Sequence, residues 1–322
     1  MQLRMPKILQ TEKEIRPFTP ITPLVRSPYL SRLTGGDVWL KLENQQATGS
    51  FKIRGALSKI GRLTPAQRAK GVVAASAGNH ALGVAYAAEA LGGVPANIFV
   101  PATAPRAKVD KLSAYAVTVH QSGDTYEAAH QAAAAFAAET GALEISAYDD
   151  VDVIAGQASV GLEIFRQRPQ ADMLIVPVGG GGLIAGVATV AAALSPTCRV
   201  VGVQPEASPA ALLSLRDGVA YDPYDHEPTL ADGLAGGFGA VPLALARDRI
   251  HDLLLCGEAD LRRAMFTLLD QHQLVVEASG AIAIAPLLTR QIDITGLTVV
   301  CVLTGGNVDT AVLRDILNEG FS

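Results

Sequence analysis

Short apolar segments alternate with longer segments of helical periodicity along almost the whole chain. The apolar segments have the length and composition of buried strands, and several end in a glycine-rich or polar turn. Strand–helix alternation of this kind predicts an α/β fold with parallel sheets covered by helices. Strands are expected in DVWLKLE, GVVAAS, ANIFVP, AVTVHQ, MLIVPV, RVVGVQPE and LTVVCVLT, and helices around residues 81–91, 108–114, 128–138 and 259–273.

The length of 322 residues exceeds one typical domain and suggests two lobes. Segment 173–198 has no charged side chain and is long enough to cross a bilayer. Because it contains Pro177 and four consecutive glycines, we expect a buried strand, a loop and a helix there, and no membrane span. Segment 212–239, rich in Pro, Gly and Asp, is expected to be a long surface excursion.

Charge and cysteine content narrow the function classes. The net charge of −5 and the scattered basic residues leave no positive patch for nucleic acid, and 5% aromatic residues leave few rings for base stacking. Cys198, Cys256 and Cys301 are far apart, which argues against disulfides and a structural zinc site and favours buried, reduced thiols. The N-terminal segment has no signal-peptide core. We therefore expect a cytoplasmic protein without nucleic-acid or membrane partners.

One lysine stands where a loop can hold its amine at a fixed point. Lys52, in SFKIRGA, lies just inside a predicted helix start, behind Thr48, Gly49 and Ser50. Alone this motif is weak, because most lysines at helix starts are solvated surface charges. It gains weight because three other loops supply what a phosphorylated aldehyde cofactor needs.

The first of these loops is the glycine run at residues 179–182, between a predicted strand and a helix. Bare backbone amides at a helix start form an anion site suited to a phosphate. A tight turn alone would require only one or two glycines.

A dinucleotide-binding interpretation competes with this one. Gly180, Gly182 and Ala185 fit G-x-G-x-x-A, and Glu206 lies near the place of a ribose-binding acid. This pattern arises easily in glycine-rich loops, and it leaves Lys52 unexplained.

The second loop, SAGNHA at residues 76–81, presents backbone donors before a helix, suited to a carboxylate or a ring substituent. Asn79 can bond a phenolic oxygen of a cofactor, and the alternative is ordinary helix capping by Ser76 or Asn79. His80 is a candidate for acid–base chemistry, although a single histidine at a helix start is more often structural. In the third loop, LTGGNVD, Thr304 can aim its hydroxyl at a ring nitrogen; Asn307 as a helix N-cap is the alternative, and both can hold at once.

In this order and spacing, KLENQQATGSFKIRGA, SAGNHALGVA, PVGGGGLIAGVA and LTGGNVD closely resemble the serine/threonine dehydratase group of fold type II pyridoxal phosphate enzymes. That group includes threonine ammonia-lyases, serine dehydratases and serine racemase. The resemblance covers nearly the whole chain and implies two three-layer α/β/α lobes with mostly parallel sheets. Residues 1–65 and 148–322 would form the large cofactor-binding domain, and residues 66–147 a smaller, substrate-side domain inserted in it. A homodimer is also implied.

The resemblance gives each loop a role. Lys52 would form the Schiff base with pyridoxal 5'-phosphate, and Phe51 would lie against the cofactor ring. Asn79 would bond the ring hydroxyl, and Thr304 would face the pyridine nitrogen. The phosphate would be held by Gly179, Gly180, Gly181, Gly182 and the amide of Leu183. The substrate carboxylate would be surrounded by Ser76, Ala77, Gly78, Asn79 and His80.

The implied activity converts a β-hydroxy amino acid, L-threonine or L-serine first, to a 2-keto acid and ammonia. A substrate amine would displace Lys52, whose pKa is lowered by burial, and the freed lysine would take the Cα proton. Because Thr304 supplies no full counter-charge to the ring, prompt β-elimination would be favoured over transamination. Bulkier substrates (phenylserine, a hydroxyectoine-derived acid or 3-hydroxyaspartate), an amino-acid racemase or β-replacement enzyme, a nucleotide-binding oxidoreductase and a non-catalytic relative remain alternatives.

The chain departs from the family pattern at informative positions. Serine racemases carry a serine where this chain has Ala77, which cannot donate a proton, so racemisation is expected to be poor. Metal-binding members carry acids where this chain has Gln204, Ser208 and Ala210, so no metal site is expected, although Glu206 could contribute to one. Because the sequence ends at Ser322, the regulatory domain of biosynthetic members, and its isoleucine feedback, are expected to be absent.

Overall fold

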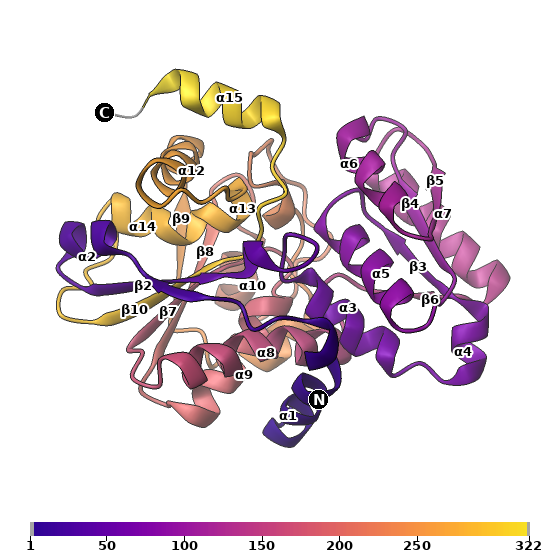
Figure 1. The fold of residues 1–322 in the computed structure, drawn as a ribbon, viewed down its shortest axis with the longest axis horizontal. Helices are drawn as coiled ribbons and strands as arrows, with labels where there is room; N and C mark the ends of the chain where they lie inside the picture. Colours follow the sequence, from indigo (N-terminus) through magenta and orange to yellow (C-terminus); the bar gives the residue numbers. More distant parts are fainter. Residues whose placement is uncertain (1–2, 321–322) are drawn as a thin grey trace.

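The segments expected as strands form two separate sheets, one in each of two lobes that lie side by side (Figure 1). The computed structural model describes residues 3–320. The larger sheet has the strand order β1-β2-β10-β7-β8-β9, in which β1 is antiparallel to β2 and all other neighbours are parallel. Its strands are β1 (Leu24–Arg26), β2 (Asp37–Leu42), β7 (Met173–Pro177), β8 (Arg199–Pro205), β9 (Asp252–Cys256) and β10 (Thr298–Leu303).

Helices cover both faces of this sheet, which is why its central strands are apolar on both sides. Figure 1 shows α8 and α9 below the sheet and α12 to α14 above it. The first face carries α1 (Met5–Ile15), α8 (Val151–Gln167), α9 (Gly182–Leu194), α10 (Ala210–Asp217) and α11 (Ala240–Ala246). The second face carries α2 (Pro28–Thr34), α12 (Glu258–His272), α13 (Ala278–Ala281), α14 (Ala285–Leu288) and α15 (Thr310–Glu319).

The smaller lobe contains a parallel sheet with the order β5-β4-β3-β6. One face packs on α5 and the other on the alanine-rich α7, in the segment expected to be helical. The strands are β3 (Val72–Ala75), β4 (Ala96–Val100), β5 (Thr118–Gln121) and β6 (Leu143–Glu144). The helices are α4 (Pro65–Lys70), α5 (Asn79–Ala90), α6 (Arg106–Asp110) and α7 (Tyr126–Thr140).

Helix α3 (Lys52–Gly61) lies between the two lobes (Figure 1). Its apolar residues, among them Ile53, Leu57 and Ile60, pack into the core of the smaller lobe. Its other side packs against α8 of the larger lobe. The domain boundary expected at residue 65 stays a prediction; α3, which precedes it, packs into the core of the smaller lobe and also contacts α8 of the larger lobe.

The uncharged segment 173–198 folds as expected into β7, the glycine loop and α9. Within residues 3–320, no helix combines the length and the apolar character needed to cross a membrane. The surface excursion expected at 212–239 is partly wrong, because α10 continues to Asp217 and the side chains of Ala231, Leu234 and Phe238 are buried. Only the middle of segment 212–239 is therefore irregular and exposed.

Close contact between α8 and α9 requires a glycine at position 186. A Cβ added at Gly186 would lie 2.7 Å from the nitrogen of Ala158 and 2.9 Å from the carbonyl oxygen of Ile154. Both are backbone atoms of α8, so the contact cannot be relieved by a rotamer change. The separation of these two helices is therefore fixed by the absence of a side chain.

We expect Gly186→Ala to lower the free energy of unfolding by about 1–3 kcal/mol, because the added methyl forces the two helices apart. Urea denaturation measures this change. Gly61→Ala is the matched control, since Gly61 is also helical and its nearest neighbour to an added Cβ, Leu91 Cδ1, is 4.0 Å away. G61A should be neutral or stabilising by up to about 1 kcal/mol. A G186A protein as stable as wild type would contradict this account of the α8–α9 contact.

Candidate active site

Three of the four loops follow the carboxyl ends of neighbouring parallel strands, β2, β10 and β7. Ligands of parallel α/β sheets bind at this edge. The loops after β2 and β10 are joined by backbone hydrogen bonds: Phe51 N donates to Thr304 O over 3.1 Å, and Gly306 N donates to Gly49 O over 2.9 Å. The loop that carries Lys52 is therefore fixed directly to the loop that carries Thr304.

Lys52 is the first residue of α3, as predicted. Its Nζ donates to the carbonyl oxygen of Ala147, 3.1 Å away, and lies 5.2 Å from the centre of the Phe51 ring. Burial lowers the pKa of Lys52 to about 8, and the nearby carboxyl group of Glu277 offsets part of this shift. At pH 7 roughly a tenth of this amine is therefore uncharged, far more than for an ordinary lysine.

The glycine loop presents free backbone donors. The first amides of a helix have no acceptor within the helix, and α9 begins at Gly182. Among residues 3–320, none of the amides of residues 179–183 donates to another backbone or side-chain group. Gly181 has φ +92°, a conformation that favours glycine. This set of unpaired amides suits an anion.

Packing explains the other glycines of this loop. A Cβ at Gly180 would overlap the ring of Tyr148, and one at Gly179 would lie 2.9 Å from Cα of Leu234. Tyr148 directly follows Ala147, which accepts the hydrogen bond from Lys52, so residues 147–148 connect the amine to the glycine loop. Tyr148 was not among the expected site residues; its hydroxyl donates to the carboxylate of Asp222.

The turn before α5 is open on one side. Gly78 is the N-cap of α5 and no side chain caps the helix, so the capping alternative for Ser76 and Asn79 is wrong. The hydroxyl of Ser76 instead accepts from the backbone nitrogen of Gly78 over 3.1 Å. A Cβ at Gly78 would meet no heavy atom within 4 Å. Packing does not require this glycine, and the space beside it is available to a ligand.

His80 is a structural residue of this turn. Its Nε2 lies 2.7 Å from the carbonyl oxygen of Ile145, and a carbonyl only accepts, so Nε2 carries the proton. Burial and then the charge of Lys52 lower the pKa of His80 to about 4. The neutral imidazole joins α5 to the chain that follows β6, and this bond leaves Nε2 no free role in acid–base chemistry.

Asn79 is oriented by a chain of polar side chains. Asn307 Nδ2 donates to Asn79 Oδ1 over 2.7 Å, and Asn79 Nδ2 donates to Glu277 Oε1 over 2.6 Å. Lys111 Nζ donates to Asn307 Oδ1 over 3.1 Å and extends the chain to the surface of the smaller lobe. Because each amide oxygen accepts and each amide nitrogen donates, Asn79 keeps one N–H free for a ligand.

Glu277 is a site residue that the sequence analysis missed. Burial raises its pKa to about 7, the hydrogen bond from Asn79 opposes this shift, and Asp232 adds to it. The signal was present, since Glu277 is the one acid in the apolar segment LVVEASGAIAIAPLL, residues 274–288. A glutamate in an apolar segment is expected to have a polar partner, because burying a carboxyl group without one costs free energy.

Thr304 and Asn307 complete the site. The hydroxyl of Thr304 is buried and donates to the carbonyl oxygen of Ser279 over 3.3 Å. Asn307 as an N-cap is wrong, because α15 is capped by Asp309, whose side chain accepts from the nitrogen of Ala311. Asn307 instead joins the Thr304 loop to Asn79. No group of three or more His, Cys, Asp or Glu side chains within residues 3–320 is arranged to hold a metal ion.

Comparison with known proteins identifies the family. A family model described as pyridoxal-phosphate dependent enzyme matches residues 15–305. The L-threonine ammonia-lyase of Thermotoga maritima is 40% identical over 315 residues, which cover 98% of this chain and 78% of that protein.

Solved structures agree. Maize serine racemase superposes with a TM-score of 0.91 at 32% identity, covering 99% of this chain and 98% of that one. The processed form of threonine deaminase isoform 2 from Solanum lycopersicum gives a TM-score of 0.90 at 32% identity, covering 99% of this chain and 89% of that one. The expected fold class is confirmed, and the covalent-cofactor hypothesis prevails over the dinucleotide one. The chain belongs to the family of pyridoxal-phosphate-dependent enzymes, as the four loop motifs predict.

Proposed function

We propose that this enzyme is an ammonia-lyase that converts a β-hydroxy amino acid, L-threonine or L-serine, to a 2-keto acid and ammonia. The observation that carries the proposal is that the amine of Lys52 bonds to Ala147, while the next residue, Tyr148, lies against Gly180 in a loop of unpaired backbone amides. The relatives support it, since proteins 38–40% identical over nearly the whole chain are named L-threonine ammonia-lyase or L-threonine dehydratase.

The residues present fit pyridoxal phosphate. The unpaired amides of residues 179–183 would hold its phosphate, and the free N–H of Asn79 would bond the ring hydroxyl. Phe51 would pack against the ring, and Thr304 would turn its hydroxyl from Ser279 towards the ring nitrogen. When bound, the cofactor supplies an aldehyde that captures amino groups and an electron sink for the pair left at Cα.

The turn at residues 76–80 would bind the substrate. Gly78 borders open space, and no side chain caps the start of α5, so its first backbone amides are available to a ligand. A carboxylate is the substrate group that a helix start favours, because the amides and the helix dipole are both positive there. Binding at this turn would place Cα beside Lys52.

Lys52 would act as the base. Its pKa of about 8 leaves a neutral Nζ available near physiological pH, and a neutral amine can accept the Cα proton. The carbonyl of Ala147 holds Nζ on one side of the site, so proton removal would take place from that side only.

The fold alone does not separate lyases from racemases, since both kinds of enzyme share it. The difference would lie at position 77, where this chain has an alanine without a proton to donate. Ala77 is therefore our reason for proposing a lyase that racemises poorly.

A homodimer and a cytoplasmic location are further parts of this proposal. Both are implied by the sequence resemblance. The dimer is also supported by an apolar groove between α1, α8 and α9, where Leu9 and Leu194 are 44% and 51% exposed.

The direct test of the function is Lys52→Ala. The wild-type protein should be yellow when loaded with pyridoxal phosphate and should release keto acid from L-threonine or L-serine within a panel of L- and D-hydroxy amino acids. K52A should lose the absorption band and more than about 1,000-fold in turnover, because it lacks both the linkage and the base. Lys59→Ala is the matched control, since Lys59 lies on the same helix and pairs with Asp150. A K52A protein that keeps the band and the activity would refute the assignment.

Ala77→Ser tests the discrimination between elimination and racemisation. The added hydroxyl would supply a proton donor on the face of the substrate opposite Lys52. We expect A77S to form D-serine from L-serine several-fold faster than wild type, measured by chiral chromatography. An unchanged rate of D-serine formation would remove our reason for proposing a poor racemase.

Glu277→Gln should change how stability depends on pH. The folded-state pKa of about 7 exceeds the roughly 4.3 of an unfolded glutamate, so the folded protein binds more protons in between. This contribution is complete below about pH 4 and is lost as pH rises through 7. E277Q keeps an acceptor for Asn79, so it should match wild type at pH 4 and exceed it at pH 8 by about 1–2 kcal/mol, after allowing for solvent screening. Urea denaturation at both pH values measures this; a difference independent of pH would contradict the raised pKa.

A further inference from the structure

Four charged side chains are fully buried beside α3, and none has a role in the chemistry above. We call Lys41, Glu43, Arg54 and Glu163 the Arg54 cluster; each is 0% exposed. Two are cationic and two anionic, so their formal charges cancel. Arg54 lies two residues after Lys52, in the first turn of α3.

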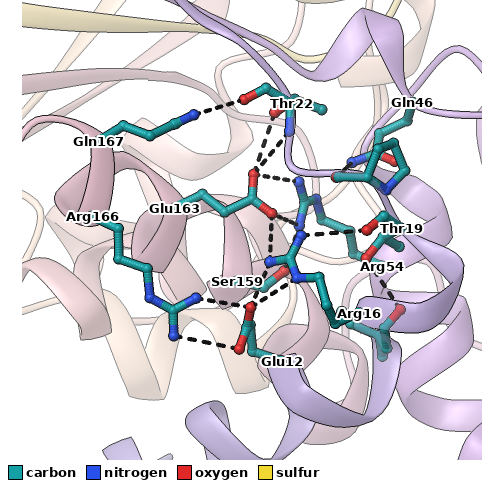
Figure 2. Close-up of polar contacts among 12 residues, drawn as sticks. Glu12, Arg16, Thr19, Thr22, Gln46, Arg54, Ser159, Glu163, Arg166 and Gln167 are labelled. Carbon is teal, nitrogen blue, oxygen red and sulfur yellow. Dashed lines mark hydrogen bonds and ion pairs between the residues drawn. The ribbon is translucent and has the colours of Figure 1, made fainter.

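Arg54 is held on two sides at once. Its Nε and Nη2 donate to the two carboxylate oxygens of Glu43, each over 2.8 Å. Its Nη1 and Nη2 donate to the oxygens of Glu163 over 2.9 and 3.0 Å, and Nη1 also reaches Ser159 Oγ over 2.9 Å. Figure 2 shows this guanidinium against Glu163 and Ser159. Glu43 directly follows β2 and Glu163 lies on α8, so Arg54 joins α3 to both elements.

The carboxylate of Glu163 has two further cationic partners besides Arg54. Lys41 Nζ lies 2.7 Å from Oε2, and Arg16 Nη2 lies 2.8 Å from Oε1 (Figure 2 shows Arg16 and Thr22 beside this carboxylate). Burial alone would raise the pKa of Glu163, but the charges and hydrogen bonds of Arg54 and Lys41 outweigh it and hold the pKa at about 2. The carboxylate therefore stays charged at all physiological pH values, and the contacts are permanent.

Stability alone does not account for this cluster. Replacing a buried ion pair by apolar residues of similar volume is often neutral or stabilising, because desolvation offsets the attraction between the charges. A bidentate guanidinium does impose direction, which an apolar contact does not. The cluster is therefore suited to fixing the position of α3 along α8.

That position sets the geometry of the site. On one side of α8, a Cβ at Gly156 would overlap the carbonyl of Arg54, so α3 and α8 are in backbone contact. On the other side, α8 is in backbone contact with α9 at Gly186. Lys52 is the first residue of α3 and Gly182 the first of α9. The distance from the amine to the glycine loop is therefore set by how α3 and α9 sit on α8.

The apolar side of α3 packs into the smaller lobe, and no side chain caps its start. Ser58 and Lys59 hold the later turns of α3 to α8 and to Asp150, and the Arg54 cluster supplies the bidentate contact in its first turn, beside Lys52. We propose that Arg54 is a positioning residue, which fixes the start of α3 on α8 and so holds Lys52 at a constant distance from the glycine loop. This inference rests on the proposed role of Lys52.

The test removes one positive and one negative charge of the Arg54 cluster together. Arg54→Met combined with Glu163→Met removes one charge of each sign, which leaves Lys41 and Glu43 and avoids an uncompensated buried charge. In cofactor-free full-length protein, the pH dependence of Lys52 acetylation by trace acetic anhydride, read by mass spectrometry, reports the pKa of this amine. Wild type should titrate near the pKa of about 8. The folded double variant should titrate about one unit or more higher, towards the ordinary value of ~10.4, because a displaced amine regains water.

The loaded enzyme gives a second readout. The double variant should lose about ten-fold or more in kcat/KM, since misplacement of a catalytic group by about 1 Å has large effects. Ser58→Ala is the matched control: Ser58 is buried on the same helix and donates to the carbonyl oxygen of Asp152 on α8, outside the cluster. S58A should lower the melting temperature and leave the titration of Lys52 unchanged.

Arg54→Lys keeps the charge and loses the bidentate geometry, so it gives the same comparison if the double variant does not fold. An unchanged Lys52 titration in either folded variant, or an equal shift in S58A, would overturn the positioning role. These outcomes are separate from a failure of the proposed function, which the Lys52→Ala experiment detects in a protein with an intact cluster.

Discussion

The placement of one partly buried amine, at the start of a helix between two lobes, is the constraint on which this structure depends. A lysine in water is charged and cannot accept a proton, whereas burial lowers the pKa of Lys52 to about 8. Lowering the pKa in this way requires the groups around the amine to be held in place, and these groups come from elements far apart in the sequence. The carbonyl of Ala147 contacts the amine, the Thr304 loop holds the backbone before it, and α8 supports the helix that begins with it.

The site relies on backbone groups more than on side chains. The amides of residues 179–183 have no acceptor within residues 3–320 and would hold an anion in the proposed function, and a Cβ at Gly78 would meet open space. Backbone amides change little with sequence, so the same fold can serve racemases and threonine deaminases alike. Under the proposed function, differences between lyases and racemases would then depend on a few side chains around these backbone groups, and Ala77 is the one that we propose.

Much of this could be predicted from the sequence, because the loops carry local signals. The glycine run after an apolar strand, the start of α3 at Lys52 and the alternation of strands and helices all follow from neighbouring residues. The long-range pairings could not be predicted. Glu277 is 198 positions from Asn79, and Glu163 is 109 from Arg54, so nothing local indicates either contact. The N-cap alternatives for Asn79 and Asn307 were wrong for the same reason, since these two residues bond to each other across the site. Ser76 instead accepts a local hydrogen bond from the nitrogen of Gly78.

The most direct measurement of the central claim is peptide mapping after the cofactor-loaded protein has been reduced with borohydride. Reduction makes the link between cofactor and lysine permanent, so mass spectrometry identifies the modified residue. We predict a single pyridoxyl group, on the peptide that contains Lys52, formed in proportion to the cofactor bound. A label on another lysine, or no label on a protein that binds the cofactor, would contradict the account.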